Sequence, residues 1–371
     1  MAKIKIYLWA VLFCLFAKSG AAQSYPLEQI KLPEGFRIEM YVSGIPGARA
    51  MALGDNNTVF VGNRQDGKVY ILTDKNQDYK VDKIYTISNI FETPPNGVAY
   101  KDGSLYIGEI GRVLRIDHMD EGIPATFKPV LVTDRLPKDG WHGWKVIRFG
   151  PDGKLYIPVG APCNTCVKRD PRYGSMMRMN PDGTELEIFA KGIRNSVGYD
   201  WDPRTNELWF TDNGRDMLGD DLPPDELNHA PRPGMHFGFP YCFGKDISDP
   251  VFGKERACSE FEPAAQELGA HVASLGMRFY RGDMFPEEYK DQILIAEHGS
   301  WNRSKKNGYR LTLVRVKDNK AVSYEDFATG WKQGESVWGR PVDILNMPDG
   351  SILVSDDYTG AVYRIFYEGS K

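Results

Sequence analysis

The chain has 371 residues, 42% hydrophobic and 26% charged, which are the proportions of a folded protein rather than a disordered one. Its 38 Gly, 24 Pro, 19 Tyr and 18 Phe favour many short strands joined by tight turns. The formal net charge of -4 provides no basic field that could hold a nucleic-acid backbone, so a nucleic-acid partner is not expected.

The first 22 residues have the pattern of a signal peptide. Lys3 and Lys5 precede an apolar run over residues 6–17, and the small residues at 19–22 suit cleavage by signal peptidase. The run is shorter than the ~20 residues that span a bilayer. We therefore expect a periplasmic or secreted protein, with no stable membrane span after cleavage and a single domain over residues 27–368.

One pattern recurs along the mature chain: a turn rich in Asp, Asn and Gly, a strand of alternating apolar residues, a polar tip and a second strand. The Asp-Gly pairs supply the positive φ of a tight hairpin, and the alternation predicts a strand with one buried face. Six copies occur, at residues 55–62, 102–108, 151–157, 206–212, 292–299 and 348–355. Their spacing is typical of four-stranded propeller blades.

The repeats predict an all-β fold, a six-bladed β-propeller with four-stranded blades. The longer gap after the fourth copy predicts an insertion between the fourth and fifth blades, over about residues 215–290. The segment at 36–41 is expected to complete the last blade and remove its open edge. A β-sandwich explains the even spacing less well. Ring closure would leave a central channel whose mouth collects loops from every blade.

Four cysteines remain after cleavage of the leader, and an even number in an exported protein indicates disulfides. We predict the pairs Cys163–Cys166 and Cys242–Cys258, each closing a local loop. The Cys-x-x-Cys pair could instead be a redox motif or half of a zinc site. The other two cysteines lie far along the sequence from this pair, which supports a four-cysteine zinc site poorly.

A histidine stands between two glycines and two tryptophans in the segment 140–144. This residue, His142, follows a proline-containing turn and precedes a strand, which suits a loop at the channel mouth. A histidine near its ordinary pKa of ~6.5 can take a proton from a substrate hydroxyl. Flanking glycines allow close approach, and tryptophans offer flat apolar walls. The alternative is a loop histidine held by a hydrogen bond.

Three further polar segments are candidates for binding. Arg194 and Asn195 can present a fixed cation and an amide to a polar ligand, or form a turn that pairs with an acidic neighbour. The segment 212–228 has the carboxylates and free carbonyls that calcium prefers, although a solvated acidic loop would look the same. Arg303 and Arg340 each lie near a tryptophan and could reach the channel, or form surface pairs.

Together these segments resemble the soluble glucose/sorbosone dehydrogenase family. Members of that family are six-bladed propellers that hold pyrroloquinoline quinone (PQQ) in the channel mouth. The resemblance extends from about Leu32 to Ile365, and the Cys-x-x-Cys pair and the segment 298–303 are similar to the sorbosone dehydrogenase branch. It is carried by His142 with residues 150–156, by Arg194-Asn195, by the acidic residues of 220–228, by 234–240 and by 340–343.

The resemblance implies roles for three residues in the reaction. His142 would be the general base that removes a hydroxyl proton of the sugar while a hydride passes to PQQ. Arg194 would hydrogen-bond the reacting quinone oxygen and stabilise the negative charge that develops there. Asn195 would help to position the cofactor.

The same resemblance implies residues that hold the cofactors. A calcium ion would be bound in part by the backbone carbonyls of Gly214 and Arg215. Arg303 and Arg340, with Lys145 as a further candidate, would anchor the carboxylates of PQQ. The chain differs from the glucose enzymes at Val342, where they have a second basic residue, and its calcium loop is longer, with an inserted Met-Leu pair at 217–218.

The sequence therefore predicts an exported PQQ-dependent dehydrogenase that oxidises an aldose sugar or a sugar-derived aldehyde such as sorbosone. Its partners would be that small molecule and an external electron acceptor. Two alternatives are a non-catalytic propeller that binds carbohydrate or protein, and a calcium-dependent lactonase, which would need carboxylate and asparagine side chains converging on the metal. A nicotinamide enzyme is disfavoured because no Gly-x-Gly-x-x-Gly joins a strand to a helix.

Overall fold

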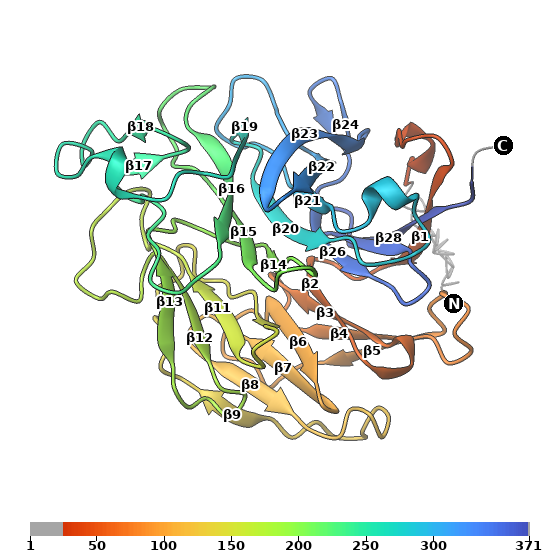
Figure 1. Ribbon diagram of the computed structural model, residues 1–371. Helices are drawn as coiled ribbons and strands as arrows, with labels where there is room; N and C mark the ends of the chain where they lie inside the picture. The colour runs from red at the N-terminus through yellow and green to blue at the C-terminus, as the bar shows by residue number, and fades with distance from the viewer. Residues whose placement is uncertain (1–24, 370–371) are drawn as a thin grey trace, which may run out of the picture.

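Six four-stranded antiparallel sheets surround a central axis in the computed structural model, which describes residues 25–369 (Figure 1). The predicted six-bladed β-propeller is thus confirmed. The segment predicted to be a signal peptide lies outside the described residues. Within 25–369, the helical segments are four short 3₁₀ turns, at Leu27–Gln29, Asp55–Asn57, Cys258–Glu260 and Glu287–Tyr289. No helix there is long and apolar enough to cross a bilayer.

The first three blades follow one another along the chain. The first contains β2 (Ala48–Leu53), β3 (Val59–Asn63), β4 (Val69–Thr73) and β5 (Lys83–Ile87). The second contains β6 (Gly97–Lys101), β7 (Ser104–Gly108), β8 (Val113–Ile116) and β9 (Val130–Thr133). The third contains β10 (Arg148–Phe149), β11 (Leu155–Val159), β12 (Ser175–Met179) and β13 (Glu187–Lys191).

The last three blades include the insertion and the ring closure. The fourth contains β14 (Tyr199–Trp201), β15 (Leu208–Asp212), β16 (Pro224–Ala230) and β19 (Gln266–Ala270). The fifth contains β20 (Ser274–Phe279), β21 (Ile293–Glu297), β22 (Arg310–Lys317) and β23 (Lys320–Ala328). The sixth contains β26 (Pro341–Asn346), β27 (Ile352–Asp356), β28 (Ala361–Tyr367) and β1 (Phe36–Ser43).

The extra chain of the fourth blade runs between its third and fourth strands, β16 and β19. It carries the hairpin of β17 (Cys242–Phe243) and β18 (Ile247–Ser248), which lies at the outer rim of the ring (Figure 1). A second small hairpin, β24 (Lys332–Gln333) and β25 (Ser336–Val337), precedes the sixth blade. The insertion therefore enlarges one blade without interrupting the ring.

The six repeated sequence segments overlap the second strand of each blade, from β3 to β27. Their residues are almost entirely buried because neighbouring blades cover both faces of these strands. The first strand, β1, pairs antiparallel with β28, from Phe36 opposite Tyr367 to Ser43 opposite Ala361. The expected closure of the last blade by the N-terminal strand is confirmed.

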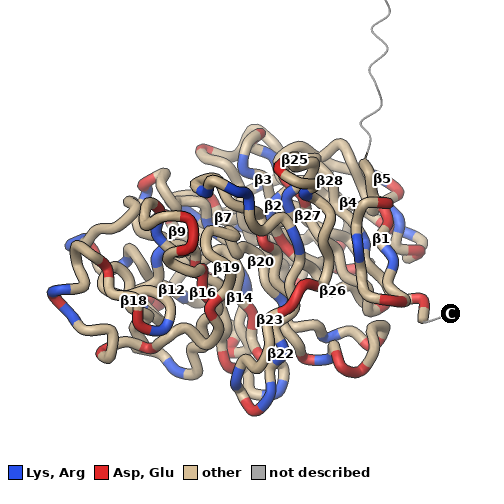
Figure 2. The backbone as a smooth tube through the Cα atoms, turned by 90° about the horizontal axis from the view of Figure 1, so that it is seen from above, with Lys and Arg blue, Asp and Glu red and all other residues tan. Residues whose placement is uncertain are grey.

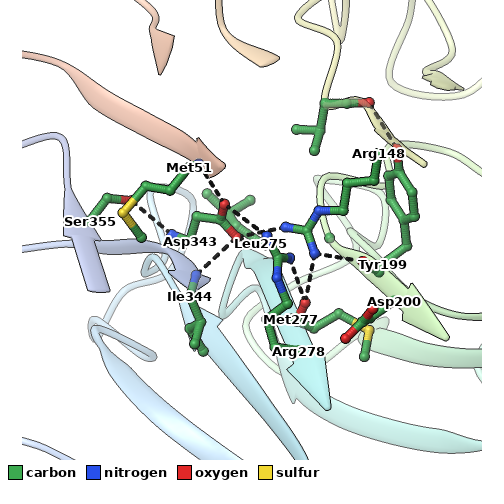
Figure 3. Close-up of polar contacts among 12 residues, drawn as sticks. Met51, Arg148, Tyr199, Asp200, Leu275, Met277, Arg278, Asp343, Ile344 and Ser355 are labelled. Atoms are coloured by element: carbon green, nitrogen blue, oxygen red, sulfur yellow. Dashed lines mark hydrogen bonds and ion pairs between the residues drawn. The ribbon is translucent and has the colours of Figure 1, made fainter. Parts of the chain in front are cut away.

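The first strands of the blades line the channel, and a polar network crosses it. Nη2 of Arg148 on β10 lies 2.9 Å from Oδ1 of Asp343 on β26, and Nη1 of Arg278 on β20 lies 3.4 Å from the same oxygen (Figure 3). The backbone N–H of Met51 on β2 donates to Oδ2 of Asp343 at 2.9 Å. Side chains from opposite sides of the ring therefore meet between the two mouths of the channel.

Acidic and basic residues are interspersed along the backbone in the view of Figure 2. This agrees with a net charge near zero for a chain of this length.

Candidate functional site

A cavity of about 350 Å³ lies at the mouth where the first strands of the blades begin. Loops from all six blades line it, so residues far apart in the sequence meet there. Among its lining side chains are four arginines, three histidines and two aspartates. Of the residues singled out in the sequence, the lining includes His142, Arg194, Asn195, Gly214 and Arg340.

His142 is fixed in one tautomer by its surroundings. Its backbone has a positive φ of 51°, and its Nδ1 lies 2.7 Å from the carbonyl oxygen of Ala161. A carbonyl only accepts, so Nδ1 carries the proton and Nε2 is left as an acceptor. The indole N–H of Trp141, a side chain that is 57% exposed, donates to this Nε2 at 3.1 Å.

His142 packs closely against the backbone of Gly160. A Cβ at Gly160 would come within 2.5 Å of the Cβ of His142, so only glycine allows this approach. Burial, with a smaller contribution from the charge of Arg194, lowers the pKa of His142 to about 3. The imidazole is therefore neutral at physiological pH and can accept a hydrogen bond at Nε2.

Arg194 is buried, and its guanidinium group is bound on most sides. Nε donates to the carbonyl oxygen of Asn164 at 2.9 Å, and Nη1 donates to the carbonyl oxygen of Asn213 at 3.2 Å. Nη2 donates to Oδ1 of Asn164 at 3.0 Å and to Oδ2 of Asp216 at 3.1 Å. Four of its five N–H donors are thus used, and one N–H of Nη1 is left for a ligand.

Asn164 is a residue that the sequence analysis missed. Besides holding Arg194, its Oδ1 accepts from the backbone N–H of Asp216 at 2.8 Å, and its Nδ2 donates to the carbonyl oxygen of Asp216 at 3.0 Å. It lies within the loop closed by the disulfide Cys163–Cys166, which the structure contains as predicted. The disulfide therefore fixes the loop that positions Arg194. The place of Asn164 between the two cysteines was the signal available in the sequence.

The second predicted disulfide, Cys242–Cys258, is also confirmed and lies in the insertion of the fourth blade. The side chain of Arg215 points towards this insertion, where its Nη1 lies 2.5 Å from Oδ2 of Asp249. Arg215 does not line the cavity with its side chain. Any contribution of Arg215 to an ion site would come from its backbone carbonyl.

The buried acidic residues beneath the cavity hold loops in place. The carboxylate of Asp212 accepts from the backbone N–H groups of Arg194 at 2.7 Å and Asn195 at 2.6 Å. Asp225 accepts from the N–H of Gly214 at 2.9 Å. Burial raises the pKa of Asp212 to about 7 and that of Asp225 to about 6. Across residues 25–369, no group of three or more His, Cys, Asp or Glu side chains is arranged to hold a metal ion.

Two predicted anchors lie outside the cavity lining. Arg303 is turned towards the 219–221 loop, where its Nη1 contacts the carbonyl oxygen of Asp220 and lies 3.0 Å from Oδ1 of Asp221. Lys145 is 1% exposed, and its Nζ donates to the carbonyl oxygen of Gly143 at 2.6 Å. Burial lowers the pKa of Lys145 to about 7. Lys145 thus stabilises the turn that carries His142.

Arg340 does line the cavity, next to side chains that the sequence analysis did not identify. Its Nη2 lies 3.0 Å from Oδ1 of Asp357, and Asp357 also binds Arg49. Arg64 lies in the same wall, over the ring of Trp144. Arg49 and Arg64 come from the first blade, which carried no candidate motif in the sequence.

The fold and the cavity define a six-bladed β-propeller with a polar binding site at one mouth of its channel. Residues 25–364 match the family described as a domain of unknown function (DUF7133), and the chain belongs to this family. It is 36% identical over 355 residues to an uncharacterized protein of Borreliella burgdorferi, covering 91% of each chain.

Two further proteins with similarity to this chain have names that specify an activity. The aldose sugar dehydrogenase YliI of Escherichia coli is 25% identical over 210 residues, which cover 51% of this chain and 54% of that protein. The holo form of the pyranose dehydrogenase PQQ domain from Coprinopsis cinerea superposes with a TM-score of 0.73 at 18% identity, over 91% of this chain and 97% of that one. At this identity the structural likeness establishes a shared fold.

Proposed function

We propose that this protein is a PQQ-dependent dehydrogenase that oxidises an aldose sugar or a sugar-derived aldehyde of the sorbosone type. The observation that carries the proposal is the neutral His142, with an unprotonated Nε2, in one cavity with Arg194 and Asn195. The names of the similar Escherichia coli and Coprinopsis cinerea proteins, a sugar dehydrogenase and a PQQ domain, point to the same class.

The lining of the cavity fits an anionic, planar cofactor. PQQ carries three carboxylates, and the four arginines of the lining exceed its two aspartates in charge. Arg340, Arg194 and Asn195 would hold it, since Arg303 and Lys145 lie outside the lining. When bound, PQQ would supply the two-electron acceptor that the protein's own side chains lack.

A calcium ion would be bound by oxygen atoms other than a carboxylate cluster. Gly214 lines the cavity, and its carbonyl and that of Arg215 are hard oxygen donors of the kind that calcium takes. The carboxylate of Asp225 already binds the N–H groups of Gly214 and Ser274. The site therefore does not favour a calcium-dependent lactonase, which would need free carboxylates converging on the metal.

The protein's part in the reaction is proton removal and charge stabilisation. Nε2 of His142 takes the hydroxyl proton of an aldose or of an aldehyde hydrate, which prepares the carbon for loss of its hydrogen as hydride. The substrate hydroxyl replaces the indole N–H of Trp141 as the hydrogen-bond partner of Nε2, and the exposed Trp141 side chain can move aside. The remaining N–H of Arg194 stabilises negative charge as it develops in the cavity.

The test is titration of the purified apo protein with PQQ and calcium, followed by absorbance, and then reduction of an artificial dye with glucose or sorbosone. We expect saturable PQQ uptake and sugar-dependent dye reduction. Binding of sugar without turnover would instead indicate a non-catalytic carbohydrate-binding propeller. Absence of PQQ uptake would contradict the proposal.

We further propose that the protein is exported and passes electrons to an external acceptor. The signal-peptide pattern of residues 1–22 supports export, and the two disulfides are of the kind that persist in oxidising compartments. Fractionation of cells that produce the full chain should place the mature protein outside the cytoplasm. Retention of residues 1–22 in the isolated protein would contradict this.

A further inference from the structure

Arginines gather in the cavity wall between the first and sixth blades. Arg49 lies on β2, Arg64 follows β3, and Arg340 directly precedes β26. The aspartates of the lining, Asp216 and Asp225, are bound by Arg194 and by backbone N–H groups. These two aspartates therefore do not neutralise the three arginines of this wall.

A single buried carboxylate, that of Asp357, serves two of these arginines. Its Oδ2 lies 3.0 Å from Nη1 of Arg49, and its Oδ1 lies 3.0 Å from Nη2 of Arg340 and 2.9 Å from Nε2 of His298. Burial alone would raise the pKa of Asp357, but His298 and the two guanidinium groups lower it below its usual range. One negative charge thus faces two positive charges before Arg64 is counted.

Arg64 has no counter-ion of its own. Its guanidinium carbon lies 3.8 Å from the ring centroid of Trp144, and within residues 25–369 the group makes no hydrogen bond or ion pair. Burial and the nearby charge of Arg49 lower its pKa to about 10, so Arg64 remains charged at neutral pH. A half-buried cation without a partner is costly in free energy unless a ligand supplies the opposite charge.

We propose that Arg64, held over Trp144 and flanked by Arg49 and Arg340, binds a carboxylate group of the ligand in this cavity. A guanidinium group matches a carboxylate with two parallel N–H donors, and the aromatic ring keeps it in one plane. The proposal rests on the proposed function for the identity of the ligand. The carboxylate belongs either to PQQ or to an acidic sugar substrate.

The test is calorimetric titration of three variants beside the wild type, with PQQ plus calcium as one probe. Arg64→Gln removes the charge, and Arg64→Lys keeps the charge without the paired donors. Arg315→Gln is the matched control, because Arg315 pairs with Glu325 on the fifth blade and does not line the cavity. A second arm titrates D-glucuronate and D-glucose into apo and PQQ-loaded protein.

If the carboxylate belongs to PQQ, Arg64→Gln weakens PQQ binding by roughly 10- to 100-fold, the loss typical of a charged hydrogen bond, and Arg64→Lys weakens it less. If it belongs to the substrate, PQQ affinity is unchanged and glucuronate, but not glucose, loses affinity. Arg64→Gln should unfold close to the wild-type temperature, because it loses the contact with Trp144 but breaks no ion pair among residues 25–369.

The proposal is overturned if PQQ and glucuronate both bind the wild type and Arg64→Gln with equal affinity, or if neither of them binds the wild type. Equal PQQ affinities would overturn the role of Arg64 in cofactor binding while leaving the proposed dehydrogenase intact. Glucuronate binding that depends on Arg64, without any PQQ binding, would support the carboxylate site and contradict the cofactor.

Discussion

The two mouths of the channel differ in how their arginines are paired. The opposite mouth opens into a larger cavity, about 640 Å³, lined by Arg148, Arg278 and Arg281. There Arg281 binds both carboxylate oxygens of Asp200 at 2.6 and 3.0 Å, and Arg148 binds Asp343. At the mouth that contains His142, Arg64 and one N–H of Arg194 have no acceptor among residues 25–369.

Volume and positive charge therefore do not by themselves make a cavity a binding site. The arginines of the larger cavity are satisfied by protein oxygens, so a ligand there would have to displace ion pairs. In the smaller cavity, the guanidinium group of Arg64 and one N–H of Arg194 lack an acceptor among the described residues. Nε2 of His142 can accept a hydrogen bond there.

Replacing His142 by Ala should lower kcat of the PQQ-loaded protein by about 100- to 10,000-fold, because the general base is lost. Dye reduction at saturating sugar measures the effect, and PQQ affinity should be unchanged. Tyr100→Phe is the matched change at the opposite mouth, where Tyr100 lines the cavity, and it should leave kcat unaltered. A similar loss in both variants would remove the functional distinction between the two mouths.

Replacing Arg148 by Gln should destabilise the fold by no more than about 3–5 kcal/mol, because the buried carboxylate of Asp343 loses the closer of its two ion pairs and keeps Arg278. Chemical denaturation measures this free energy of unfolding. PQQ affinity at 25 °C should remain that of the wild type in the folded protein. Weakened binding without loss of stability would show that the network across the channel serves the site directly.

Replacing Asn164 by Ala should lower kcat by about 10-fold to 100-fold, because Arg194 loses the side-chain acceptor Oδ1 of Asn164 and is held less firmly. The backbone oxygen of Asn164 remains, so the KM for sugar should change little. Thr165→Ala, in the same disulfide loop, is the control and should behave like the wild type. If both variants lose the same activity, the loop as a whole, and not the Asn164 side chain, positions Arg194.

The free energy of unfolding should fall as pH rises from about 4.5 through about 8. Burial raises the pKa of Glu226 to about 8, so the folded state holds its proton in a range where the unfolded state releases it. The stabilisation from this proton is complete at pH values below the pKa of Glu226 in the unfolded chain. It is lost at pH values above the pKa of Glu226 in the folded protein. Denaturation curves at several pH values should show a shallower fall for Glu226→Gln, and an unchanged slope would contradict the assignment.

The sequence predicted the ring itself because each blade repeats one short-range pattern. Turn residues and alternating apolar residues marked the second strand of all six blades, from β3 to β27, and identified β1 as the closing strand. Both disulfides were predicted because each closes a local loop. Such features depend on neighbours in the sequence and can be predicted without knowledge of the tertiary structure.

The site could be predicted only in part because its members meet across the ring. Arg303 stands beside a tryptophan in the sequence, yet its side chain binds the 219–221 loop. Arg49 and Arg64 carry no motif, and they become notable only when Asp357 and Trp144 are brought beside them. Which cation is left without a partner depends on all six blades at once.

The closure of the ring also sets when the site can exist during synthesis. The sixth blade takes three strands from residues 341–367 and its fourth, β1, from residues 36–43. Arg340 and Asp357 flank strands of this blade, and Arg49 follows β1 closely in the chain. A ribosome must therefore complete nearly the whole protein before the cavity forms, so a chain threaded through a membrane during export would acquire its binding site only on arrival.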